Sequence, residues 1–152
     1  MSENDEQYME IALEEAQKAF AKEEVPIGAI IVKDSEIIAK AHNLKESNQD
    51  PTAHAEILAI DQAVEKLGGW RLLDCTMYVT IEPCVMCAGA LVESRVERLV
   101  FGAPEPKSGA AGSVFNLTNN DRLNHRLEVE SGVLAADCKQ LMKDFFVKLR
   151  ES

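Results

Sequence analysis

Hydrophobic and polar residues follow two periods along the chain, a helical one and a strand-like one, and these periods predict the secondary structure. Apolar residues at helical spacing predict four helices, at residues 6–22, 51–67, 83–94 and 135–149. Short β-branched or apolar runs predict a hairpin and three further strands, at residues 27–42, 75–81, 98–103 and 126–131. Strands and helices that alternate in this way favour one α/β sheet with helices on both faces, an α/β/α sandwich.

Two of the predicted helix starts carry residues of chemical interest. Asp50 or Thr52 can cap the second helix, which places His54 in its first turn. Cys84 and Cys87 lie at the start of the third helix, where a spacing of three residues turns both sulfurs to the same side. Because helices that open just after strands begin at one edge of an α/β sheet, we expect His54 to face the two cysteines.

Composition fits one globular domain over residues 1–152. Hydrophobic residues make up 46% of the chain and charged residues 28%. No apolar run approaches the roughly 18–20 residues that span a bilayer. The acidic first 24 residues do not resemble a secretory signal, so we expect a cytoplasmic protein with no membrane segment. The Gly, Ala and Asn-rich loop at 104–124 is long for so small a domain, which favours a functional role.

The charge is unevenly distributed along the sequence. The formal net charge is −10, which is unfavourable for binding nucleic acid. Residues 1–50 hold 12 acidic and 5 basic residues, whereas residues 90–152 hold 9 of each. The second half can therefore carry a basic face, although charge alone favours scattered, solvated side chains over such a face.

The stretch "EPCVMCAGA" contains a Cys-x-x-Cys pair, which is typical of zinc sites and of thiol redox couples and also occurs by chance. A reducing cytoplasm argues against disulfides among the four cysteines. Upstream, "PTAHAEI" places His54 two residues before Glu56. His-x-Glu followed by Pro-Cys-x-x-Cys is the signature of the zinc-dependent deaminases.

His54, Cys84 and Cys87 would supply three protein ligands to the metal. Structural zinc sites usually have four, whereas catalytic sites leave the fourth position to water. Glu56 supports the catalytic interpretation, because a carboxylate beside such a metal can take a proton from water and pass it on. We therefore predict Zn²⁺ as the cofactor and Glu56 as the catalytic residue.

The other candidate ligands have weaker patterns around them. Cys138 lies on the apolar face of the last predicted helix, and Cys75 precedes a strand, so both fit packing roles. His42 and His125 stay open as further ligands at this stage.

Several segments together give the chain a resemblance to the bacterial tRNA-specific adenosine deaminases, a branch of the cytidine deaminase superfamily. The resemblance runs nearly end to end, through "VPIGAIIV", "AHN", "DPTAHAEI", "WRLLDCTMYVTIEPCVMCAGAL", "SRVERLVFGA", "KSGAAGS", "NHR" and "DFF". It implies a five-stranded mixed sheet between helices, one zinc ion per subunit and a homodimer. It also implies hydrolysis of the wobble adenosine of a tRNA anticodon to inosine, with arginine tRNA as the usual substrate.

The same resemblance implies positions for substrate contacts. Asn43 would contact the purine, and Val25 and Ile27 would line its pocket. Lys107 and the loop around it would lie near the RNA, as would Phe145 and Arg150. Glu105 stands where the family often has Asp, and the longer side chain leaves the ribose contact open.

Two alternatives remain on the sequence alone. The zinc residues do not distinguish deamination of RNA from deamination of free guanine, cytosine or cytidine. A non-catalytic, zinc-bearing RNA-binding or scaffold protein would need a fourth protein ligand.

Overall fold

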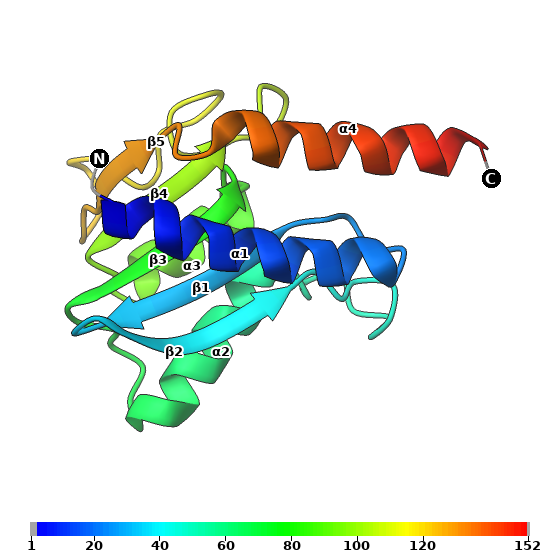
Figure 1. Ribbon diagram of the computed structural model, residues 1–152. Helices are drawn as coiled ribbons and strands as arrows, with labels where there is room; N and C mark the ends of the chain where they lie inside the picture. Colours follow the sequence, from blue (N-terminus) through cyan, green and yellow to red (C-terminus); the bar gives the residue numbers. More distant parts are fainter. Residues whose placement is uncertain (1–2, 152) are drawn as a thin grey trace.

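A five-stranded sheet in the order β2-β1-β3-β4-β5 organises the computed structural model, which describes residues 3–151 (Figure 1). The helices are α1 (Glu3–Ala21), α2 (Ala55–Leu67), α3 (Val85–Glu93) and α4 (Ala135–Glu151). The strands are β1 (Gly28–Lys33), β2 (Glu36–His42), β3 (Cys75–Ile81), β4 (Arg98–Ala103) and β5 (Glu128–Ser131). The predicted fold class is confirmed.

Strand direction decides where the loops meet. β1 is antiparallel to both of its neighbours, β2 and β3, while β3, β4 and β5 are parallel to one another. It follows that β2 runs in the same direction as β3. Both strands therefore deliver the chain to the same edge of the sheet, β2 at His42 and β3 at Ile81.

The sheet is buried on both faces, which explains why its central strands read as continuous apolar runs. Ala29 and Ile31 of β1 belong to a core cluster with residues of α2 and α3. Ile30 and Val32 point the other way, into a second cluster with residues of α1 and α4. Figure 1 shows the same division, with α1 and α4 on one face of the sheet and α2 and α3 on the other.

The starts of α2 and α3 differ slightly from the predictions. α2 begins at Ala55 with His54 as its N-cap, not at residue 51 with Asp50 or Thr52 as the cap. The Asp50 carboxylate is already used, because it accepts hydrogen bonds from the backbone N–H and the hydroxyl of Thr52 within the preceding turn. α3 begins at Val85, and Cys84 is its N-cap.

The last helix also differs from its predicted packing. The apolar residues at helical spacing in 135–149 predict a buried face that includes Cys138, Phe145 and Leu149, yet Leu149 is 55% exposed. The reason is visible in Figure 1, where the C-terminal part of α4 projects beyond the sheet. None of the helices within residues 3–151 is both long and apolar enough to cross a membrane.

A buried carboxylate fixes the loop between β2 and α2. Glu24, which follows α1 and is 1% exposed, accepts hydrogen bonds from the backbone N–H of Glu46 and from the N–H and hydroxyl of Ser47. Burial by itself would raise the pKa of Glu24. The hydrogen bonds from Ser47 and Glu46, with the nearby His42, outweigh burial and lower that pKa below its usual value.

The lowered pKa of Glu24 predicts a pH-dependent contribution to stability. A carboxylate with a depressed folded-state pKa stabilises the fold above its ordinary pKa of about 4.5, and this stabilisation disappears as the pH falls through the folded-state value. We expect Glu24→Gln to reduce the free energy of unfolding by about 2–3 kcal/mol at pH 7. In denaturant titrations the difference from the parent protein should shrink as the pH falls below about 4.5. An equal difference at pH 7 and pH 3.5 would contradict this assignment.

Candidate metal centre

Two helix N-termini meet at the sheet edge where β2 and β3 end. His54 is the N-cap of α2, and Cys84 is the N-cap of α3. Both residues have extended backbones, and neither side chain makes a capping hydrogen bond. The imidazole and the thiol are therefore directed to each other and not to their own helices, as the sequence analysis expected.

The three predicted ligands form one cluster. His54 Nδ1 lies 3.7 Å from Cys84 Sγ and 3.5 Å from Cys87 Sγ. The three ligand atoms all lie within 4.8 Å of one another. A nitrogen at about 2.1 Å and a sulfur at about 2.3 Å from a tetrahedral zinc ion lie about 3.6 Å apart. The donor set and its spacing therefore fit zinc.

The protonation of the cluster also suits a metal cation. Hydrogen bonds from Cys87 and then His54 lower the pKa of Cys84 to about 3. The pKa of Cys87 is raised, first by its hydrogen bond to Cys84 and then by burial. The hydrogen bond with Cys84 raises the pKa of His54. The lowered pKa of Cys84 favours its thiolate, as do the two helix N-termini, and a divalent cation would displace the remaining protons.

Glu56 lies beside this cluster in the first turn of α2. Its side chain is buried, with 3% of the residue exposed. Burial is the main cause that raises the pKa of Glu56, to about 7, and the negative charge of Cys84 adds to the effect. A carboxyl group with such a pKa can both accept and release a proton near neutral pH.

The two histidines that the sequence left open, and the two cysteines expected to pack in the core, lie away from the cluster. His42 hydrogen-bonds with Glu15 and Lys22, and His125 hydrogen-bonds with the carbonyl of Val96. Cys75 and Cys138 are buried in the two hydrophobic clusters. Among residues 3–151, the only group of three or more potential metal ligands is therefore His54, Cys84 and Cys87.

Asn43 connects β2 to the metal-binding end of α2. Its side-chain oxygen accepts a 2.7 Å hydrogen bond from the backbone N–H of Ala55, the first residue of the helix. Asn43 thus provides the capping bond that His54 does not make. The side-chain nitrogen of Asn43 is not needed for this bond and is available as a donor.

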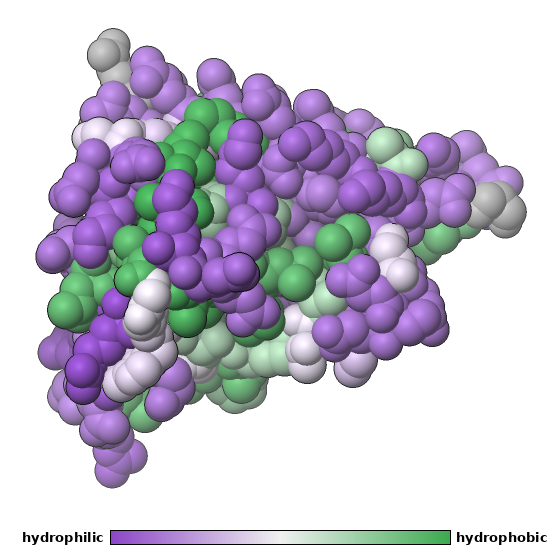
Figure 2. All heavy atoms as spheres, turned by 90° about the horizontal axis from the view of Figure 1, so that it is seen from below, coloured by the Kyte–Doolittle hydropathy of each residue, from purple (hydrophilic) through white to green (hydrophobic). Residues whose placement is uncertain are grey.

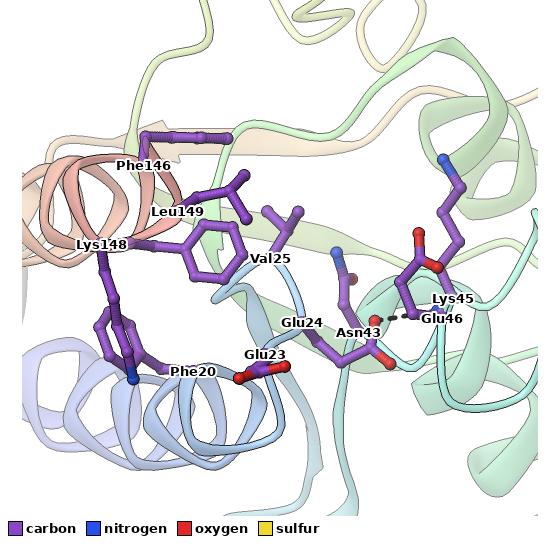
Figure 3. A pocket seen from close by; sticks show the side chains of 11 residues that line it. Phe20, Glu23, Glu24, Val25, Asn43, Lys45, Glu46, Phe146, Lys148 and Leu149 are labelled. Atoms are coloured by element: carbon purple, nitrogen blue, oxygen red, sulfur yellow. Dashed lines mark hydrogen bonds between the residues drawn. The ribbon is translucent and has the colours of Figure 1, made fainter. Parts of the chain in front are cut away.

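Asn43 and Val25 also border a cavity of about 490 Å³. Figure 3 shows them on one side of this cavity, with Phe146, Lys148 and Leu149 of α4 on the other. Phe145 lines the cavity as well and packs edge-on against Phe20, with ring centroids 5.9 Å apart.

Ile27 lies two residues after Val25 and is packed against both hydrophobic clusters. Its backbone carbonyl accepts from Asn43 and its N–H donates to Val25, while its side chain packs against the core. Ile27 is therefore not among the residues that line the cavity. The remaining predicted contacts, Glu105, Lys107 and Arg150, border a second cavity of about 860 Å³.

Glu82 is a residue of the site that the sequence analysis missed. It is 4% exposed and stands two residues before Cys84. It accepts hydrogen bonds from the backbone N–H groups of Glu105, Ala111 and Ser113 and from the Ser113 hydroxyl. These bonds overcome burial, which by itself would raise the pKa of Glu82, and lower that pKa. Glu82 thereby attaches the long loop to the metal-binding end of β3.

The chain matches known proteins along nearly its whole length. Residues 3–150 match the family model described as MafB19-like deaminase. The chain is 55% identical over 147 residues to the tRNA-specific adenosine deaminase of Bacillus subtilis, covering 97% of this chain and 91% of that protein.

Two solved structures extend the comparison. One comes from work on A-to-I editing by tRNA:A34 deaminases; it matches at a TM-score of 0.86 and 41% identity, covering 89% of this chain and 98% of the other. The other is the guanine deaminase of Nitrosomonas europaea, with a TM-score of 0.79, 27% identity, and coverage of 92% of this chain and 83% of the other.

The close contact between Gly109 and the Glu82 carboxylate predicts that a side chain at position 109 destabilises the protein. A Cβ atom on Gly109 would overlap the Glu82 carboxylate, whereas a Cβ on Gly89 of α3 would meet nothing within 4 Å. We expect Gly109→Ala to lower the free energy of unfolding by about 1–3 kcal/mol. Gly89→Ala is the matched control and should be neutral or stabilising by up to about 1 kcal/mol.

A double-mutant cycle measured by thermal or denaturant unfolding tests the contact itself. In a Glu82→Ala background the overlap is removed, so Gly109→Ala should cost less than it does in the parent protein. An equal cost in both backgrounds would show that the Glu82 carboxylate is not what restricts Gly109.

Proposed function

The chain belongs to the bacterial tRNA-specific adenosine deaminases, which are hydrolytic deaminases, and from this premise we propose its specific reaction. The reaction is zinc-dependent conversion of adenosine to inosine at the wobble position of a tRNA anticodon, with release of ammonia. Residues 1–152 form a single deaminase domain. The observation that carries the proposal is the cluster of His54, Cys84 and Cys87 with the buried carboxylate of Glu56 beside it.

His54 Nδ1 and the sulfurs of Cys84 and Cys87 would hold one zinc ion per subunit. Bound zinc supplies a water of lowered pKa at neutral pH. Three protein ligands suit this role, because a fourth protein ligand would take the position that water needs. The N-termini of α2 and α3 favour the negative charge that the thiolates bring.

Glu56 moves the protons of the reaction. It takes one proton from the attacking water and delivers it to N1 of the adenine while the water oxygen bonds to C6. It then takes the proton of the new C6 hydroxyl group and transfers it to the departing amine as the C6–N bond breaks, so that adenosine and water give inosine and ammonia. Its buried position, which raises its pKa to about 7, supports both directions of transfer.

The substrate contacts are assigned to residues at the two cavities. Asn43 contacts the purine through its side-chain nitrogen, and Val25 borders the purine pocket, two residues before Ile27. Phe145 supports the wall of this pocket from α4. The base must leave its stack to reach the metal. Glu105, Lys107 and Arg150 contact the adjoining RNA from the second cavity.

We place the enzyme in the cytoplasm as a homodimer that acts on arginine tRNA. Figure 2 shows a band of hydrophobic side chains across an otherwise hydrophilic face. Outside α4, large hydrophobic residues with at least 38% of their surface exposed are Leu67, Trp70, Leu73, Val85, Val114, Phe115 and Leu123. Such exposure supports a subunit interface.

The role of Glu56 is testable by substitution. Glu56→Gln should retain one zinc per subunit by metal analysis, because none of the three ligands changes. Its rate of deamination should fall by about 10²–10⁴-fold, since the amide cannot carry the proton. Glu65→Gln, at an exposed acid of the same helix, is the control and should keep the parental rate. Deamination by Glu56→Gln at the parental rate would remove Glu56 from the mechanism.

The substrate class is testable by direct competition. We expect the zinc-loaded protein to convert the wobble adenosine of an arginine anticodon stem-loop, read as A-to-G by sequencing, and to leave free guanine, adenosine and cytidine unchanged. The guanine deaminase of Nitrosomonas europaea shares this fold, so free guanine is the most informative competitor. Faster ammonia release from guanine than from the stem-loop would assign the protein to free-base deamination instead.

A further inference from the structure

His42, the last residue of β2, connects the metal-binding edge of the sheet to helix α1. It is 9% exposed and lies on the α1 face of the sheet, because its neighbour Ala41 belongs to the core cluster on the α2 face. Its Nδ1 lies 3.0 Å from Glu15 Oε1, and its Nε2 lies 3.0 Å from Lys22 Nζ. One imidazole therefore bonds to two residues of the same helix.

The two partners define how the imidazole is hydrogen-bonded. Burial by itself would raise the pKa of Glu15, but the hydrogen bonds of Lys18 and His42 outweigh burial and lower that pKa. The Glu15 carboxylate accepts from Nδ1–H, and the ammonium group of Lys22, which has only donors, donates to Nε2. Glu15 and Lys22 lie seven residues apart, about 10 Å along the axis of α1, so the ring is held at two separate points.

Gly28 allows α1 to come close enough for this contact. It lies in β1 and pairs directly with His42 of β2. A Cβ atom at Gly28 would overlap the backbone of Ala12 and Ala16 and would crowd the Cβ of Glu15. Because glycine has no side chain, α1 lies directly against β1, and Glu15 reaches across this strand to β2.

The residue after His42 is Asn43, whose position determines how α2 begins. The N–H of Asn43 donates to the carbonyl of Ile27 over 3.2 Å, and its side-chain oxygen accepts the 2.7 Å bond from Ala55. Asn43 is 7% exposed and Ala55 is fully buried, so little water competes for this bond. The orientation of Asn43 therefore depends on β1, on α2 and, through His42, on α1.

We propose that His42 is a positioning residue for the deamination: through its bonds to α1 it fixes the end of β2 and directs the side-chain amide of Asn43 toward the base. This inference rests on the proposed function, in which Asn43 contacts the purine. His42 is not among the residues that line the cavity at Asn43, so it acts through its neighbour and not on the substrate.

Amide hydrogen exchange, followed by NMR on the zinc-loaded protein, tests this link without reference to activity. The N–H of Ala55 is bonded to Asn43, so its exchange rate reports how well Asn43 is held. We expect His42→Ala to raise the rate at Ala55 about tenfold more than the rates of the slowest amides of β3 and β4, which follow global unfolding. Glu15→Ala should have the same selective effect. The double variant should exceed either single variant by less than about twofold, because both changes break one connection.

Steady-state kinetics on an anticodon stem-loop test the role in the reaction. His42→Ala should lower kcat about 10–100-fold and keep KM within about threefold, because a misplaced contact slows the chemistry while the rest of the RNA binds as before. His42→Asn keeps an amide donor near the position of Nδ1 and should recover most of the lost kcat. Lys40→Ala is the control, at an exposed side chain two residues earlier on the same face of β2. It should keep the parental kcat and the parental rate at Ala55.

The outcomes separate this inference from the proposed function. If the rate at Ala55 in His42→Ala rises no more than the rates of the β3 and β4 amides, His42 contributes only to stability and the inference is wrong. A selective rise at Ala55 with an unchanged kcat would also overturn it. If the rise is selective but the parent does not deaminate the stem-loop, the proposed function is overturned while the link between His42 and Asn43 stands. Should His42→Ala fail to fold, His42→Asn and Glu15→Ala carry the same measurements.

Discussion

The direction of β2 relative to β3 is the constraint on which the site depends. The two strands are separated by β1, yet they run the same way, so the chain leaves both at one edge of the sheet. α2 and α3 then begin at this edge with their N-termini facing each other, and the donors of His54 and the two cysteines come within 4.8 Å. A reversed β2 would place His54 at the opposite edge of the sheet, and no metal centre would form.

Polar side chains at this edge of the sheet hold the helix and the loop that surround the candidate metal centre. Asn43 bonds to the start of α2, which leaves the His54 imidazole to the metal cluster. Glu82 bonds to the loop that carries Lys107 and stands two residues before Cys84. The candidate metal centre, the cavity at Asn43 and the loop that carries Lys107 are thereby held to the ends of the same two strands by side-chain hydrogen bonds.

Strong periodicity made most of the fold predictable from sequence. The hairpin, the central strands and the last helix were placed almost to the residue, because buried strands and amphipathic helices leave clear patterns. The predicted start of α2 was wrong because its capping hydrogen bond comes from Asn43, 12 residues upstream of Ala55. Capping rules consider only neighbouring residues, so they do not predict such a partner. Glu82 was missed for the same reason: its importance comes from loop amides 23–31 residues away.

The projection of α4 past the sheet has a consequence for how such an enzyme changes over time. Residues on that overhang touch little of the interior, so most substitutions there alter folding free energy by no more than about 0.5 kcal/mol. The cluster of His54, Cys84 and Cys87 tolerates fewer substitutions, because its geometry depends on the N-termini of both α2 and α3. Substitutions can therefore accumulate along this helical arm without loss of the fold, while the residues of the candidate metal centre stay the same.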